Sequence, residues 1–422
     1  MKAGMYLLSL LILAGVRPAV AGPQVDWSWQ VSGRAEQLRP QSLTGAALHQ
    51  QVQAMDTRLD ASFQWDELTG LAAIRSRNIW ASDETDADHD LILQELFWQS
   101  GTEVAGIPLD ISLGKMRLDW GVGYGYRPLN ILKPYQRNPV GIQVEEGAGV
   151  AMASYFDGLG EWAFLVSDAG WARETTNDYE KNTRQKGFGL RRYALLGDTE
   201  LQVIAYYDQI RRGLLGASAV TVLNEAWEIH ASVVAQHQYK AYRQQSLFAP
   251  VTLETAHHAY QLLTGINWAD MAGVNLIAEY WYDSRSWHHS QWRQALKRSR
   301  QLAQNQATSP LALSYANGLN HENIVQHNLM LHVSLDSAAW SQWQWSRQYL
   351  WLSNFEPTFD VLISPSDGGV IATQWLDYTL YDSGQASLML ELAGRFYTGR
   401  SGSVYADLPD KRVILLNLKG SF

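Results

Sequence analysis

The chain has 422 residues, with 18 Trp, 20 Tyr and no cysteine, and its formal net charge is −9. A chain without cysteine has no disulfide framework and no thiolate metal site. The acidic excess argues against a nucleic-acid partner. Trp and Tyr at this level are typical of the aromatic girdles at the two interfaces of a membrane β-barrel, although a secreted sugar-binding β protein uses the same residues.

The first 21 residues have the pattern of a secretory signal. Lys2 precedes an apolar run at 6–16, and Ala19 and Ala21 are the small residues of a cleavage site after Ala21. The run is too short for a membrane-spanning helix, and no uninterrupted apolar stretch of ~18 residues follows it. Cleavage removes Lys2 and Arg17, which takes the formal charge from −9 to −11. We therefore expect signal peptide 1–21 and one exported domain, 22–422, without a helical anchor.

The mature chain reads as a series of amphipathic strands, because apolar and polar residues alternate with a period of two between turn signals. We place eighteen, near 25–37, 51–65, 69–80, 90–99, 107–118, 147–157, 160–168, 186–196, 199–209, 213–223, 226–237, 254–268, 272–284, 321–336, 340–352, 370–382, 385–398 and 411–422. Alternation is weak in 69–80 and 147–157, so 16 strands is the main alternative.

The connections between these strands alternate in length. Every second one is a tight turn with Gly, Asp, Asn or Ser, such as 157–160, 197–198, 270–273 and 336–337. The others are long and polar, near 38–50, 81–89, 119–146, 169–185, 238–253, 285–320, 353–369 and 399–410, with a short exception at 210–212. This alternation is expected of a single-chain outer-membrane barrel.

The period of two also divides each strand into a lipid face and a lumen face. The charged residues expected to line the lumen are Arg58, Asp60, Arg191, Glu228, Glu279, Glu391 and Arg395. In 340–352, Trp343, Trp345 and Trp351 are expected to face lipid, and Arg347 interrupts that set. A charge at the middle of the bilayer costs ~2–4 kcal/mol, so Arg347 lies near an interface or the assigned register is wrong.

The last strand ends at a C-terminal aromatic residue. Ile414, Leu416, Leu418, Gly420 and Phe422 fall on one face of 411–422. With the export signal and the amphipathic strands, this pattern resembles the Gram-negative outer-membrane β-barrels of the porin-like kind. The resemblance implies an outer-membrane location, contact with lipid and lipopolysaccharide, and recognition of Phe422 by the barrel-assembly machinery as an insertion signal. Gly420 departs from the family pattern, in which an aromatic or apolar residue is more usual.

Segment 119–149 is the main functional candidate. Gly121, Gly123 and Gly125 permit close backbone approach, and its prolines prevent strand pairing. It joins the fifth and sixth strands, the place from which many porins fold a loop inward. The resemblance thus implies a pore constriction with cations opposite carboxylates, formed by Arg127, Lys133, Arg137, Glu145 and Glu146. The alternative is an outer loop packed over the barrel rim.

Segment 290–307 has apolar residues at helical spacing beside a basic face, which predicts a helix in a surface loop that could contact lipopolysaccharide phosphates. Neighbouring His257 and His258 are expected on opposite faces of a strand, which disfavours a metal site. Ser286, His288 and Asp283 can be combined into a triad, but their spacing is not one that the chemistry requires. We predict no catalytic residue, no metal and no cofactor.

The predicted function is therefore passive passage of small polar or anionic solutes through an outer-membrane channel. One alternative is a barrel that does not transport but serves as a surface scaffold or threads a polymer. The other is a secreted, Trp-rich carbohydrate-binding β protein. The solute, and whether the barrel is a monomer or a trimer, stay open at this point.

Overall fold

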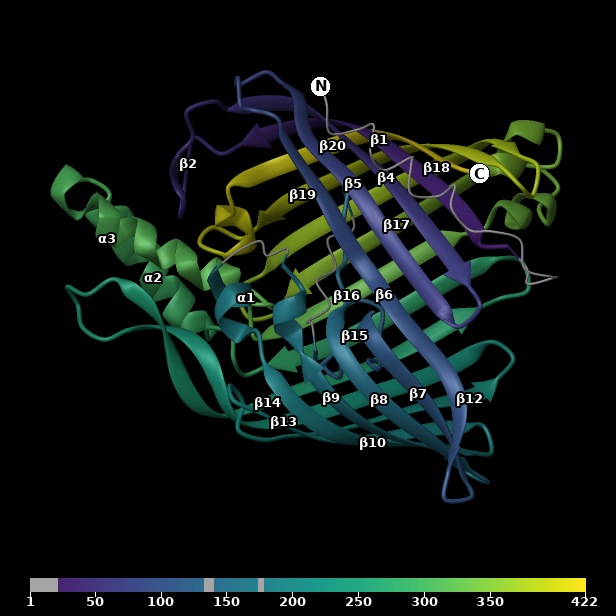
Figure 1. The fold of residues 1–422 in the computed structure, drawn as a ribbon. Helices are drawn as coiled ribbons and strands as arrows, with labels where there is room; N and C mark the ends of the chain where they lie inside the picture. The colour runs from purple at the N-terminus through teal and green to yellow at the C-terminus, as the bar shows by residue number, and fades with distance from the viewer. Residues whose placement is uncertain (1–21, 133–139, 174–177) are drawn as a thin grey trace, which may run out of the picture.

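The computed structural model describes residues 22–132, 140–173 and 178–422, and these form one closed antiparallel β-barrel of 18 strands (Figure 1). The wall consists of β1 (Gln24–Leu38), β4 (Gln51–Trp65), β5 (Leu68–Ala81), β6 (Asp88–Val104), β7 (Ile107–Met116), β8 (Ala148–Asp157), β9 (Gly160–Asp168), β10 (Lys186–Leu196), β11 (Thr199–Asp208), β12 (Leu214–Asn224), β13 (Trp227–Gln244), β14 (Val251–Ala269), β15 (Val274–Asp283), β16 (His327–Leu335), β17 (Phe355–Ser364), β18 (Gly369–Asp382), β19 (Ser387–Gly399) and β20 (Asp410–Ser421). Each strand pairs with its neighbours along the chain, and β1 pairs with both β4 and β20. The predicted 18-stranded barrel is confirmed; the predicted signal peptide lies outside the described residues.

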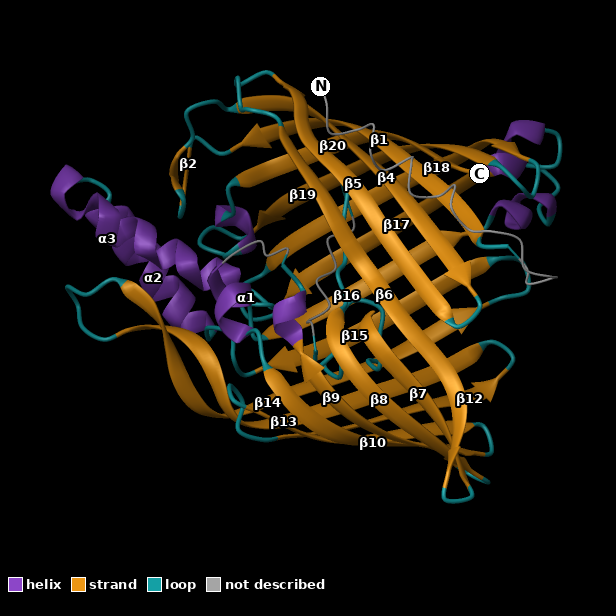
Figure 2. Cartoon of the chain, viewed as in Figure 1, coloured by secondary structure: helices purple, strands orange, loops and turns teal. Residues whose placement is uncertain are grey.

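The remaining elements are short and lie in the connections (Figure 2). They are the hairpin β2 (Gln41–Ser42) and β3 (Gly45–Ala46), the α-helices α1 (Asp178–Thr183), α2 (His289–Leu302) and α3 (Ser309–Ser314), and the 3₁₀ helices η1 (Ala169–Trp171), η2 (Gln306–Thr308), η3 (Tyr315–Asn320), η4 (Ser337–Ser341), η5 (Leu350–Asn354) and η6 (Tyr405–Asp407). None of the helices in the described ranges is long and apolar enough to cross a membrane. The helix predicted in 290–307 is confirmed as α2.

One predicted strand is wrong. Segment 340–352 contains parts of η4 and η5 rather than a strand, and the strand lies beyond it, in β17, which the sequence analysis placed in a loop. The Asp336 carboxylate accepts the N–H of Ala338 and starts η4, and the Arg347 Nε donates to the Ser341 carbonyl at 2.7 Å. The alternation of Trp and Gln in this segment imitates a strand. The charge of Arg347, which conflicted with a lipid-facing position, indicated the error.

The barrel has two different ends. At one, which we call the short-turn end, most connections are tight, and β1 begins and β20 ends there. The other, the loop end, carries the long connections, including α2 and α3 on the left of Figure 1. Near the short-turn end the outer wall exposes a series of indole rings: Trp27, Trp65, Trp98, Trp162 and Trp227. Between the ends the outer wall exposes large apolar side chains such as Val203, Leu215 and Leu392, which suits contact with lipid rather than water.

The two chain ends close the barrel. The Trp27 N–H donates to the Phe422 carbonyl at 2.8 Å, and the Phe422 N–H donates to the Trp27 carbonyl at 2.9 Å. Two residues along β1, Trp29 is paired with Gly420. A Cβ at Gly420 would lie 2.6 Å from the Trp29 ring, so the indole already occupies the space that a larger side chain would need. This contact explains why the aromatic pattern of the last strand is interrupted at Gly420.

The mouth at the loop end is covered by a separate apolar cluster. Trp292 and Leu296 of α2 pack there with Tyr242 and Val251 of the β13–β14 hairpin, and with Tyr405 of η6 from the other side of the barrel. The connection 284–326 is therefore a folded cap rather than a solvated loop. We call this segment the mouth cap.

Candidate channel constriction

The connection between β7 and β8 is described over 117–132 and 140–147, and both parts fold into the lumen. Its described parts contact the inner face of the wall on several sides. Leu129 packs with Ile204 of β11 and Val234 of β13, whereas Val140 packs with Leu415 of β20. The two described parts therefore lie against different sides of the lumen, and the rim-loop alternative does not fit these contacts. We call 117–132 together with 140–147 the inner segment.

A buried carboxylate of the wall fixes the start of the inner segment. The Glu279 side chain on β15 accepts the backbone N–H of Tyr124 at 2.5 Å and that of Gly125 at 2.8 Å. The other neighbour of Glu279 is His230 of β13, whose Nε2 is 2.9 Å from the same carboxylate. Two backbone donors and one imidazole satisfy this carboxylate, which makes it a rigid anchor.

A second anchor holds the end of the inner segment to the opposite wall. Arg58 of β4 donates to the Gln143 carbonyl, and its Nε donates to Asp60 at 2.9 Å. Lys115 of β7 forms a buried ion pair with Glu146. Because β4 and β15 lie across the barrel from each other in the strand order, the segment is tethered from both sides.

Glycines make this close packing possible. Gly123 has a φ of 107°, and a Cβ there would lie 2.4 Å from the Leu263 side chain. A Cβ at Gly125 would lie 2.5 Å from the Met330 sulfur. On the wall, a Cβ at Gly216 would lie 2.4 Å from Leu129. The close backbone approach expected of the glycines is thus observed against the lumen wall at Gly123 and Gly125, whereas Gly121 lies against Arg127 of its own segment.

The predicted constriction residues have different surroundings. Arg127 forms an ion pair with Asp119 of the same segment and donates to the Gly123 carbonyl at 2.8 Å. The Glu145 side chain is 44% exposed and lies 3.6 Å from Arg117. Glu146 is only 3% exposed. Lys133 and Arg137 lie outside the described residues.

Most of the predicted lumen charges on the wall have a partner. Arg191 forms a 2.7 Å ion pair with Glu161 and lies over the Trp120 ring. Glu391 lies 2.5 Å from Lys419, and the Arg395 guanidinium lies over the Tyr397 ring. The Glu228 carboxylate is 38% exposed and 3.8 Å from His230.

Sequence reasoning missed a network that joins the inner segment to the mouth cap. Asp283, at the end of β15, accepts from the Tyr126 hydroxyl at 3.2 Å and lies 2.6 Å from Arg285. Arg285 also pairs with Glu322 of the cap. Burial opposes the charge of Arg285, but Asp283 and Glu322 raise its pKa well above the ordinary value. These partners are far apart in the sequence and leave no local pattern. The only hint was Arg285, two residues after Asp283 at the end of a predicted strand.

The groups considered for other chemistry are arranged differently. The Ser286 hydroxyl donates to the Asn323 carbonyl, and His288 caps α2 through the Ser290 N–H, so these residues do not form a nucleophile–base pair with Asp283. The expectation that His257 and His258 face opposite sides is wrong. Both are exposed, because His258 has a φ of 62° and interrupts the alternation. Within the described residues no group of His, Cys, Asp and Glu is arranged to hold a metal ion.

No family model matches the chain, and no curated protein matches it. Solved structures do match. The chain is similar to OccAB3 of Acinetobacter baumannii, with 8% identity, coverage of 96% of this chain and 100% of that one, and a TM-score of 0.53. OccK8 (OprE) of Pseudomonas aeruginosa gives 9% identity, coverage of 96% and 98%, and a TM-score of 0.51. OpdQ of the same organism gives 6% identity, coverage of 96% and 99%, and a TM-score of 0.52.

These neighbours are Gram-negative outer-membrane porins. The protein therefore has the porin fold, a closed transmembrane β-barrel with a long segment folded inward.

Proposed function

We propose that the protein is a passive channel of the Gram-negative outer membrane for small polar solutes, anions among them, and that it performs no catalysis. The porin fold and the apolar outer wall support the membrane location. They also disfavour the soluble sugar-binding alternative, since large apolar side chains cover the outside of the barrel.

The observation that carries this proposal is the inner segment, whose two described parts are tethered inside the lumen to opposite walls by Glu279 and Arg58. A segment pinned in this way narrows an aqueous path without depending on a mobile gate. Charged groups remain accessible along it, because the side chains of Asp119 and Arg117 are 59% and 42% exposed. These groups would meet a passing solute and orient its dipole.

Conductance of the purified barrel in a planar bilayer tests the proposal. We expect stable single-channel steps, and a reversal potential in a salt gradient that favours anions. Glu279→Ala removes the acceptor of the Tyr124 and Gly125 N–H groups, so the inner segment should loosen. The steps should become larger or noisier.

The matched control is Glu228→Ala. This carboxylate also points inward from the same side of the wall, but the inner segment is not bonded to it among the described contacts. Glu228→Ala should therefore leave the mean conductance step unchanged. A gel that compares heated and unheated samples confirms folding of each variant. A folded wild-type barrel without conductance would overturn the channel proposal. Conductance steps of the same size in Glu279→Ala and in wild type would show that the inner segment does not determine the conductance.

A second candidate is a barrel that does not conduct and serves as a scaffold or a polymer conduit. The mouth cap favours it, because its apolar cluster extends from the β13–β14 hairpin to η6 across the loop end. The same recording separates the two. If wild type shows no conductance and deletion of 289–320 produces conductance steps, the second candidate is supported.

A further inference from the structure

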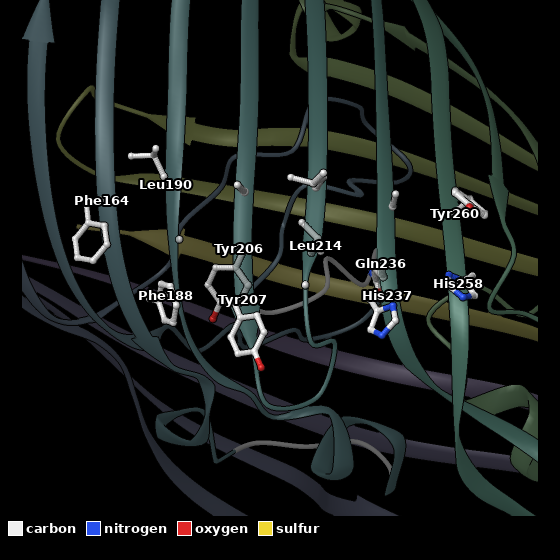
Figure 3. A pocket seen from close by; sticks show the side chains of 15 residues that line it. Phe164, Phe188, Leu190, Tyr206, Tyr207, Leu214, Gln236, His237, His258 and Tyr260 are labelled. Atoms are coloured by element: carbon white, nitrogen blue, oxygen red, sulfur yellow. The ribbon is translucent and has the colours of Figure 1, made fainter.

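The outer wall contains a trough just below the loop end (Figure 3). Its volume is about 730 Å³, and it runs across β9 to β14. Its floor contains three small residues, Ala205, Gly213 and Ala235, with Leu215 between the two alanines. Large rings stand at its two sides, among them Phe188 on one and Tyr260 on the other. The hollow thus lies over these small residues, on both sides of Leu215 and between the rings of the flanking strands.

The trough lies where the rim is lowest. β11 and β12 are joined by a short turn after Asp208, whereas β13 and β14 continue as far as Gln244 and Val251. In a porin barrel the end with the long connections faces outward. The trough therefore opens on the outer leaflet of the membrane, and its volume is within the roughly 300–1,000 Å³ of small-molecule sites.

The rim above the trough presents cations and hydrogen-bond donors. Arg212 is exposed, and its Nη1 donates to the Tyr207 hydroxyl at 3.4 Å. Within the described residues Arg212 has no carboxylate partner. The carboxylate nearest in sequence, Asp208, points into the lumen and is held by Arg211 at 2.6 Å.

His237 and His258 line the facing side of the trough, and His257 lies beside them. His237, His257 and His258 are all exposed, with ring centroids 5.5 to 6.3 Å apart. The ladder between β13 and β14 is interrupted at His237 and His258, which brings the three rings together. Lys186, beside the trough, is balanced by Asp168 at 2.9 Å. The site thus combines an apolar floor with a rim of donors that suits a phosphate group.

We propose that this trough binds the phosphorylated, acylated sugar lipid of the outer leaflet, the lipid A part of lipopolysaccharide. One acyl chain lies against Leu215 and over Ala235, and a phosphate is within reach of Arg212, His237 and His258. The trough is continuous with the lipid-facing wall, and the cationic rim complements the anionic headgroup. Binding here does not depend on conduction, so it stands or falls separately from the channel proposal.

Native mass spectrometry of the full barrel in detergent tests the proposal, with purified lipid A, phosphatidylglycerol or phosphatidylethanolamine added in equal amounts. Wild type should retain lipid A about tenfold more strongly than either phospholipid. Ala235→Leu fills the floor and should abolish that preference. The matched control, Ala219→Leu, adds the same side chain to the outer face of β12 outside the trough, and should bind as wild type does.

Headgroup recognition is tested separately. Arg212→Gln with His237→Gln should lower retention of lipid A several-fold and leave retention of its dephosphorylated form unchanged. Equal retention of lipid A by the Ala235→Leu and Ala219→Leu variants would overturn the site. Phosphatidylglycerol held as strongly as lipid A would overturn the assignment to lipopolysaccharide. The heated-gel shift shows whether each variant has folded.

Discussion

Gly420 is a residue whose absent side chain has a structural purpose. Its place in the last strand is taken by the Trp29 ring of the pairing strand, 2.6 Å from where a Cβ would lie. An aromatic ring that covers a strand glycine restores the apolar surface that the glycine lacks. The terminal aromatic pattern is therefore completed by a residue of β1, across the seam at which the barrel closes.

This contact predicts strong coupling between the two positions. Gly420→Ala should destabilise the closed barrel by about 1–3 kcal/mol, because the indole must move. In a Trp29→Ala background the same change should be close to neutral. Thermal unfolding followed by the heated-gel shift measures both.

The control for this cycle is Gly33→Ala, also at the β1–β20 seam, where a Cβ would find its nearest atom at 3.8 Å. Gly33→Ala should therefore change the stability of the barrel little. Additive effects of the two substitutions would show that Trp29 does not occupy the space at Gly420.

At the scale of elements, the mouth cap contains a buried histidine. Burial lowers the pKa of His321 from 6.5 to about 4, with Arg285 adding to the effect and Asp283 opposing it. Its Nε2 faces the N–H of Tyr242 at 3.5 Å, and the Tyr179 and Tyr242 rings pack around it. A proton on Nε2 would place one donor against another.

Because the pKa in the closed cap is lower than in the open one, the opened cap takes up the proton first. The stability from the neutral imidazole is present above pH 6.5 and is lost as the pH falls toward 4. Between pH 7 and 5 the cap should lose about 2 kcal/mol. Hydrogen exchange in 284–326, corrected for its intrinsic pH dependence, measures the opening.

His321→Asn should abolish this pH dependence, since an amide oxygen can accept the same N–H without titrating. The control is His288→Asn, in the same connection, where the exposed histidine caps α2 and asparagine is a good replacement. Opening that is equal at both pH values in wild type would contradict this role of His321.

Sequence patterns predicted most wall elements, because the period of two and the turn residues are local properties. Even 69–80 and 147–157, where alternation is weak, became β5 and β8. Segment 340–352 failed because its Trp and Gln residues alternate while their backbone forms 3₁₀ turns. β17 was missed because Pro357 reads as a strand breaker. It is tolerated there, since pairing with β16 begins only at Thr358.

The candidate site was predictable in position but not in contacts. The glycines and prolines of 119–149 predicted an irregular segment, and parity predicted that Glu279 and Arg58 face inward. The pairing of Tyr124 with Glu279 could not be predicted, because 155 residues separate them and no spacing rule covers that distance. The pairing of the loop cation Arg127 with Asp119 of its own segment was not predicted either.

For the whole molecule, this long separation determines an order of assembly. The start of the inner segment cannot reach its anchor until β15 is in the wall, because Glu279 is on that strand. Closing such distant contacts is slow relative to local hairpin formation. We expect refolding to show resistance to SDS first and protection of the inner segment from trypsin, at Arg117 and Arg127, later.

Glu279→Ala should delay only the second phase, and simultaneous phases would contradict this order. In the cell, the interval between them would leave each newly inserted barrel wider than its mature form. Fresh outer membrane would then be transiently leaky in proportion to the rate at which this protein is made.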